Sequence, residues 1–303
     1  MIPRTSTVQG VLLALLTGLA WGTNGVSVKL IQGFSASGLS VLMLGTCFFV
    51  TVLTFLLRGR GAQLLQPVSV SGWLILLGAI LGVQFLFSMS SYQLALAPNA
   101  ALFNQMTPIF VVLLTWLVLH QRIERTTLLG IALAGVGASM LVGLQHISLS
   151  SEYFLGNLMA IASSFLTAIF AITVSRRAAH VPLGVLIAWT FGVAALVAVL
   201  YGIVTPPLFN NPPLRSWVIA FLFPALFAAT FGHFCYIRAL QLIPPERVAS
   251  LVLSSPLFTS ILAYYMLSER LDSVGLAGFL LTLAGIFVVT QSTIRPQSTA
   301  VLT

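Results

Sequence analysis

The sequence has very little charge. Charged residues make up 6% of its 303 residues, whereas an average soluble domain contains about 25%. Such a chain cannot cover a water-facing surface. With 58% hydrophobic residues and a mean hydropathy of +1.07 it is typical of a polytopic membrane protein. The composition therefore predicts an all-α fold whose solvent and first partner is the lipid bilayer.

Reactive groups are also scarce. The two cysteines, Cys47 and Cys235, lie far apart in apolar runs, which argues against a disulfide framework or a zinc site. All five acidic residues fall at the ends of apolar runs or between them, so no carboxylate is available for a buried proton relay or for intramembrane aspartyl chemistry. The sequence has no HExxH motif, no GxSxG serine and no GxxxxGK[ST] phosphate-binding loop. We therefore expect no enzyme, no cofactor and no metal.

Basic residues outnumber acidic ones, and the net charge is +8. They are too few and too scattered to form a nucleic-acid-binding stripe, so we expect no nucleic-acid partner. They lie between apolar segments. If the chain crosses the membrane an even number of times, most of the basic residues fall on the same side of the membrane. Only Lys29, Arg215 and Arg270 fall on the other. This bias predicts a multi-pass membrane protein with both termini in the cytoplasm.

Ten apolar runs of about 20 residues predict ten transmembrane helices. The first run continues past any small-residue cleavage site and predicts a span rather than a signal peptide. The longest connection, about 205–216, is rich in Pro and Asn and predicts an exposed turn. The predicted spans are 9–30, 37–57, 72–94, 99–119, 126–144, 153–175, 183–204, 216–240, 248–267 and 274–292.

The two halves of the chain resemble each other. When Pro108 is aligned with Pro256, identical residues coincide along spans four and five and spans nine and ten. Similarly, "GVLLAL" in span one aligns with "GNLMAI" in span six. We predict two five-helix repeats, 1–145 and 146–303, and because five is odd the second is inverted in the membrane. The matched pairs are Ala101 with Ala249, Pro108 with Pro256, Phe110 with Phe258, Leu114 with Leu262, Arg122 with Arg270, Gly130 with Gly278, and Gly137 with Gly285.

The paired prolines lie inside spans four and nine. Each lacks an N–H group and collides with the carbonyl four residues earlier, so each is expected to kink its helix and free a carbonyl. Inverted repeats typically hold a substrate site near the bilayer midplane. We interpret Pro108 and Pro256 as hinges, and a static kink that improves packing is the alternative.

Polar side chains inside the spans are candidates for a substrate site. His233 is the only histidine within a span, and it could bind a substrate or carry a proton, or it could simply be satisfied by a neighbouring helix. Serines can also hydrogen-bond their own helix. Lys29 can extend to the interface or contact an anion. The predicted substrate-binding residues are Trp21, Asn24, Gln84, Ser88, Tyr92, Asn104, Gln105, His233, Tyr236, Ser254 and Ser255.

Two stretches carry a family resemblance. The segment "WGTNGVSVKL" in span one and the run "YIRALQLIPPERVASLVLSSPLFTSILAYYMLSERL" resemble the drug/metabolite transporter superfamily in its EamA group. The first repeat departs from that pattern, with "LHQR" where an acidic residue often precedes the arginine. The resemblance implies a cavity lined by spans one, three, four, six, eight and nine, with spans five and ten as a scaffold.

Similar bacterial proteins export amino acids and their derivatives across the cell inner membrane. The resemblance therefore implies a multi-pass secondary transporter of the cell inner membrane for a small-molecule substrate. We expect it to work by alternating access, as a monomer or homodimer. The alternatives are an uptake carrier for a nucleoside-like or vitamin-like compound and a membrane scaffold that transports nothing.

Overall fold

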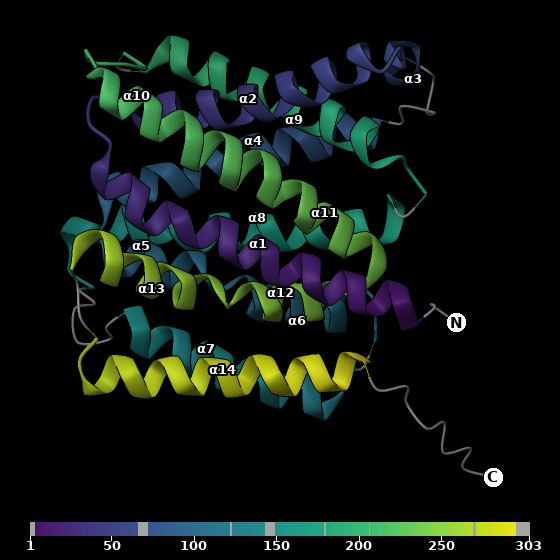
Figure 1. The fold of residues 1–303 in the computed structure, drawn as a ribbon, viewed down its shortest axis with the longest axis vertical. Helices are drawn as coiled ribbons and strands as arrows, with labels where there is room; N and C mark the ends of the chain where they lie inside the picture. The colour runs from purple at the N-terminus through teal and green to yellow at the C-terminus, as the bar shows by residue number, and fades with distance from the viewer. Residues whose placement is uncertain are drawn as a thin grey trace.

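The fold is a bundle of helices that cross the molecule side by side (Figure 1). The computed structural model describes residues 4–65, 72–121, 123–142, 149–178, 180–205, 207–268 and 271–294. Within these ranges the only strand-like pairing is an isolated bridge between Phe34 and Phe209. Arg122 and Arg270 lie outside the described residues.

The ten predicted spans are confirmed, since ten segments of the described chain are long and apolar enough to cross a membrane. Seven are single helices, and the other three are divided. The short helix α3 (Gly61–Leu65) lies between spans two and three, and the short helix η2 (Ser151–Tyr153) forms the start of span six. The single helices are α1 (Arg4–Leu30), α2 (Ala36–Leu57), α4 (Gly72–Leu94), α7 (Arg125–Val142), α8 (Phe154–Arg177), α9 (Leu183–Val204) and α14 (Ser273–Ile294). The divided ones are α5 (Ala97–Asn104) with α6 (Thr107–Leu117), α10 (Leu214–Ala220) with η3 (Phe221–Gly232) and α11 (His233–Leu242), and α12 (Pro245–Val252) with α13 (Ser255–Leu267).

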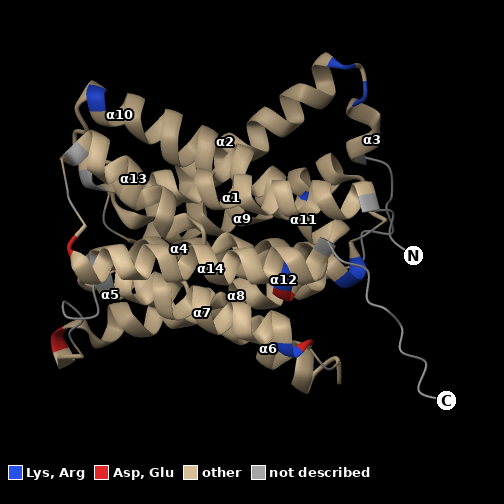
Figure 2. Ribbon diagram, turned by 60° about the horizontal axis from the view of Figure 1, so that its bottom comes forward, with Lys and Arg blue, Asp and Glu red and all other residues tan. Residues whose placement is uncertain are grey.

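The bundle has two chemically different ends. We call the end where α1 begins and α14 ends the terminus end, and the opposite end the far end (Figure 1). Figure 2 shows Lys and Arg gathered mainly at the terminus end, whereas Arg215 lies at the far end, on α10. This separation of charge matches the bias predicted from the sequence.

The two halves run in opposite directions and contact each other with matching elements. The divided span α12–α13 packs on α1, the first span of the other half, and α5–α6 packs on α8 in the same way. Helices α7 and α14 lie together at one edge of the bundle (Figure 1). The fold is therefore two inverted five-helix repeats.

A seam of glycines joins α7 to α14. Gly130 approaches the carbonyl of Gly285, and Gly278 approaches that of Gly137. These are the same glycines that the self-alignment matched, now in contact across a pseudo-twofold axis. Because glycine has no side chain, two membrane helices can approach closely enough there for their backbones to be in contact. The seam holds spans five and ten together as one unit.

The loop before α10 was predicted to be an exposed turn, and for part of its length this is wrong. The Leu208 carbonyl accepts hydrogen bonds from the backbone N–H of Ser35 at 3.1 Å and from its hydroxyl at 3.0 Å. Phe34, Phe209 and Trp217 form a cluster with ring centroids 4.8–5.3 Å apart. The aromatic residues draw this loop onto the connection between α1 and α2 at the far end.

Span eight contains an unexpected π-helix, η3, with Pro224 inside it. The proline supplies no N–H, so the regular α-helical bonding cannot pass through it unchanged. Within this segment the hydroxyl of Thr230 also donates to the carbonyl of Ala225, five residues earlier, at 2.8 Å. Regular α-helix resumes at His233. π-Helical turns often lie at functional sites.

Candidate functional site

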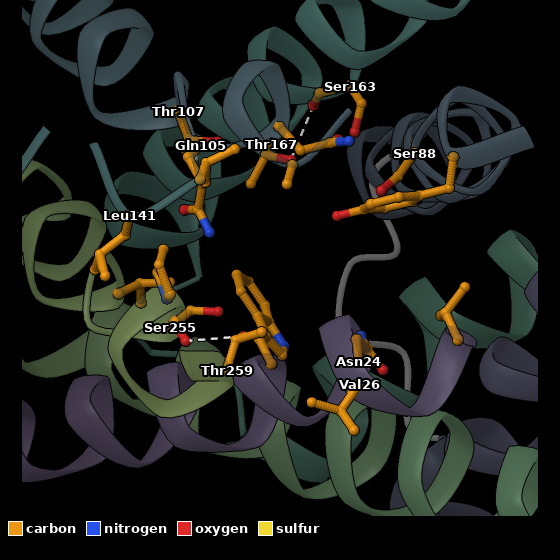
Figure 3. Close-up of a pocket in the computed structure, with 18 of the residues that line it drawn as sticks. Asn24, Val26, Ser88, Gln105, Thr107, Leu141, Ser163, Thr167, Ser255 and Thr259 are labelled. Carbon is orange, nitrogen blue, oxygen red and sulfur yellow. Dashed lines mark hydrogen bonds between the residues drawn. The ribbon is translucent and has the colours of Figure 1, made fainter. Parts of the chain in front are cut away.

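A cavity of about 730 Å³ lies between the two halves (Figure 3). Its size falls within the range of about 300–1,000 Å³ that is usual for small-molecule sites. Most of its lining comes from spans one, three, four, six, eight and nine, as the resemblance implied. Met43 of span two, Met140–Val142 of span five and Gly275 of span ten also contribute, so spans five and ten are not only scaffold.

Spans four and nine are broken at the cavity rather than kinked, which corrects the prediction. Helix α5 ends at Asn104 and α6 begins at Thr107, while α12 ends at Val252 and α13 begins at Ser255. In each case the proline is the second residue of the new helix. There its missing N–H costs little, and its fixed backbone angle favours the start of a helix.

A side-chain hydrogen bond links each broken span to the other half of the protein. Ser164 on α8 donates to the carbonyl of Phe103 at 2.7 Å, just before the first break. After the second break the bond runs in the opposite sense, because Thr259 on α13 itself donates to the carbonyl of Gly22 on α1 at 2.8 Å. Both breaks line the cavity through Pro108 and Pro256.

Aromatic rings form one part of the cavity lining. We call Trp21, Phe85, His233 and Tyr236 the aromatic floor. The Trp21 ring lies 4.9 Å from both His233 and Tyr236, and Phe85 lies 5.3 Å from His233. His233 also donates from Nδ1 to the carbonyl of Ala229 at 3.1 Å. The sequence places these rings on three separate spans, and the fold brings them together.

Neutral polar side chains form another part of the lining. We call Gln84, Ser88, Asn104, Gln105 and Thr167 the polar wall. Figure 3 shows Ser88, Gln105 and Thr167 on one side of the cavity and Asn24 and Ser255 on the other.

Two members of the wall are held in place by serines. Gln84 donates to Ser163 at 3.0 Å, and Asn104 donates to Ser91 at 3.0 Å. Tyr92, also predicted, lines the cavity beside them.

Ser254 is the one predicted site residue that the structure does not bring to the cavity. It is 2% exposed, and a methyl group added at Gly18 would come within 2.0 Å of its hydroxyl oxygen. It therefore packs against α1, while its neighbour Ser255 lines the cavity. Sequence reasoning did not identify the lining residues Ser163 and Thr167. Their spacing of four along span six, which places both on one face of a helix, was the available signal.

The cavity reaches the far end and is closed at the terminus end. Leu271 and Asp272 line it at the far end. At the terminus end α12 packs against α6, and Arg247 donates to Glu124 at 3.1 Å, so the two halves meet there through an ion pair. The wall between the cavity and the terminus end is thus made by α6 and α12, the segments of the two broken spans that lie nearer the terminus end.

Replacing Pro256 with alanine is expected to repair the second break. The new N–H can donate to the carbonyl of Val252, so α12 should extend into α13. We expect amide hydrogen exchange across 253–257 to slow about tenfold, with the thermal midpoint kept. Pro182→Ala, at an exposed loop position, is the control. Unchanged exchange in Pro256→Ala would show that cross-repeat packing, not the proline, maintains the break.

Taken together, ten spans in two inverted halves, broken helices and a cavity between the halves define the architecture of a secondary transporter. The EamA-like transporter family matches residues 8–143 and 154–291, one match for each half. The chain belongs to this family, within the drug/metabolite transporter superfamily.

Its relatives are similar along most of their length. An uncharacterized transporter of Archaeoglobus fulgidus is 26% identical over 92% of this chain and 96% of its own. The protein PecM of Dickeya dadantii is 24% identical over 81% of this chain and 88% of its own. A crystal structure with 21% identity superposes with a TM-score of 0.78 over 96% of this chain and 98% of the other, which supports the fold.

Proposed function

We propose that this protein exports a small metabolite, an amino acid or a compound derived from one, across the cell inner membrane by alternating access. One observation carries the proposal. The cavity between the inverted halves is open at the far end and sealed at the terminus end by contacts between those halves. Because the halves are related by inversion, exchanging their conformations would seal the far end and open the terminus end.

The deciding experiment compares metabolites in host cells that carry or lack the gene. If the protein is an exporter, one small metabolite should accumulate in the medium and fall in the cells when the gene is present. Accumulation inside the cells instead would favour the uptake of a nucleoside-like or vitamin-like compound. An unchanged metabolite profile with confirmed membrane insertion would contradict the transport proposal.

The direction of export requires that the terminus end faces the cytoplasm. A reporter enzyme that is active only in the cytoplasm, fused after Thr303, is expected to be active. The same reporter inserted after Asn210, at the far end, is expected to be inactive. The physical reason is the charge bias, since Arg58, Arg176 and Arg247 all lie at the terminus end. The opposite pair of results would overturn the proposed orientation.

A further inference from the structure

We propose that the cavity selects an uncharged molecule with a planar ring, which lies on the aromatic floor and hydrogen-bonds through neutral groups to the polar wall. The inference rests on the proposed transport function and narrows its substrate class. It favours an amino-acid-derived compound with its charges masked, or a nucleoside, over a free amino acid.

Among the described residues, the cavity lining supplies almost no formal charge. None of the described residues that line the cavity is Lys, Arg or Glu. The one aspartate among them, Asp272, lies at the mouth, next to the start of α14. A charged ligand must lose its water when the cavity closes, and without an opposite charge nearby that loss is strongly unfavourable.

The broken helices do not replace the missing charges. Helices α6 and α13 both begin at the cavity, and a helix N-terminus can bind an anion through its free N–H groups. Here, however, Pro108 and Pro256 have no N–H. The next two amides of α6 donate to the carbonyl of Met106 at 3.0 and 3.3 Å, and those of α13 to the carbonyl of Ser254 at 3.0 and 3.2 Å. These bonds occupy two of the three N–H groups that the first turn of each helix could offer a carboxylate or phosphate.

The aromatic floor offers a surface for a planar ligand, and Trp21 of the floor and Asn24, one helical turn further along α1, offer unused hydrogen-bonding groups. Nε1 of Trp21 and Oδ1 of Asn24 are buried and make no hydrogen bond within the described structure. Unmet buried donors and acceptors are costly, so a ligand that reaches them after a small side-chain rotation gains the bonds. One is a donor and the other an acceptor, which suits an amide or a nucleobase edge. The rings around them favour a planar group by stacking.

The test measures binding to the purified full-length protein by calorimetry at pH 6 with matched probes. N-acetyl-phenylalaninamide and adenosine are the uncharged members of two series. Their charged counterparts are N-acetyl-phenylalanine and phenylalaninamide in one series and adenosine monophosphate in the other. N-acetyl-leucinamide tests the ring. We expect the better uncharged probe to bind at least about tenfold tighter than its charged counterparts and about fivefold tighter than N-acetyl-leucinamide. The two series distinguish an amino-acid-derived ligand from a nucleoside.

A matched pair of variants places the selectivity in this cavity. The Gln105 side chain extends into it (Figure 3), so Gln105→Lys should improve binding of N-acetyl-phenylalanine, and Gln105→Glu should improve binding of phenylalaninamide. Because the two expected shifts have opposite signs, a general loss of folding cannot produce both. The same substitutions at Gln63, which is exposed on α3, should change neither.

The remaining outcomes overturn the inference. Equal or tighter binding of a charged probe would show that the cavity accepts charge, and failure of every probe to bind would show that the floor and wall do not form such a site. Neither result touches the transport proposal, which the metabolite comparison decides without any of these probes. Conversely, unchanged metabolites together with selective binding would indicate a binding site that does not transport.

Discussion

Gly137→Ala is expected to destabilise the protein by about 3 kcal/mol, whereas Gly135→Ala, two residues away on the same helix, is expected to leave its stability unchanged or slightly raised. A methyl group at Gly137 would come within 2.4 Å of the backbone nitrogen of Thr282 on α14. Backbone cannot move aside as a side chain can, so α7 and α14 must separate. Nothing lies within 4 Å of a methyl group at Gly135.

The inverted repeat leads us to expect the same destabilisation at a second position. Gly285 is the repeat counterpart of Gly137, and a methyl group there would come within 2.3 Å of the backbone nitrogen of Ala134. Gly285→Ala should therefore lower the thermal midpoint about as much as Gly137→Ala. Thermal unfolding of the three variants in one detergent is the measurement. If Gly135→Ala and Gly137→Ala lower the midpoint equally, the close seam between α7 and α14 is wrong.

Breaking the Glu124–Arg247 ion pair is expected to let the cavity open at the terminus end. The pair links the two halves at 3.1 Å, and its side chains are 26% and 17% exposed. A charged hydrogen bond of this partly exposed kind is worth about 1.5 kcal/mol, which is more than a fully exposed pair and less than a buried one. Removing it should therefore raise the population open at the terminus end roughly tenfold, since about 1.4 kcal/mol is a factor of ten.

Thiol labelling measures this opening. Thr167→Cys places a thiol in the cavity, and the native Cys47 and Cys235 are buried. A membrane-impermeant reagent added at the terminus end should label this thiol about tenfold faster when Glu124→Gln is also present. Exchanging the charges, with Glu124→Arg and Arg247→Glu together, should restore slow labelling.

A control variant shows whether faster labelling comes from loss of the Glu124–Arg247 ion pair or from the loss of any charge at this end. Arg58→Gln removes an exposed cation at the same end and should leave the labelling rate as it was. Equal labelling with and without the Glu124–Arg247 pair would mean that packing of α6 against α12 alone closes the cavity. The carrier would then need another gate.

The membrane fold could be derived from the sequence because it depends on local properties. Runs of apolar residues determine the spans, and an odd number of spans per repeat determines the inversion. Most of the candidate site could be predicted for a similar reason. A polar side chain such as Gln84 or Asn104 inside an apolar run must face a partner or a cavity rather than lipid. Their roles in substrate binding remain predictions.

Other features depended on contacts between distant segments. Ser254 and Ser255 are identical neighbours in the sequence, and only the rotation of their helix against Gly18 decides that one packs on α1 and the other faces the cavity. The prolines predicted a disturbance in each span, but only the fold brings Ser164 of α8 to the carbonyl beside the first break and Thr259 of α13 to the carbonyl of Gly22 on α1.

The end at which the cavity is closed is a tertiary property as well. Glu124 and Arg247 are 123 residues apart, and nothing in either local segment indicates that they meet. Two inverted repeats of similar sequence are compatible with closure at either end of the bundle. The tertiary structure decides between them, because the packing of α6 on α12 and the ion pair beside it stabilise the closed terminus end, while the cavity separates the corresponding helices at the far end.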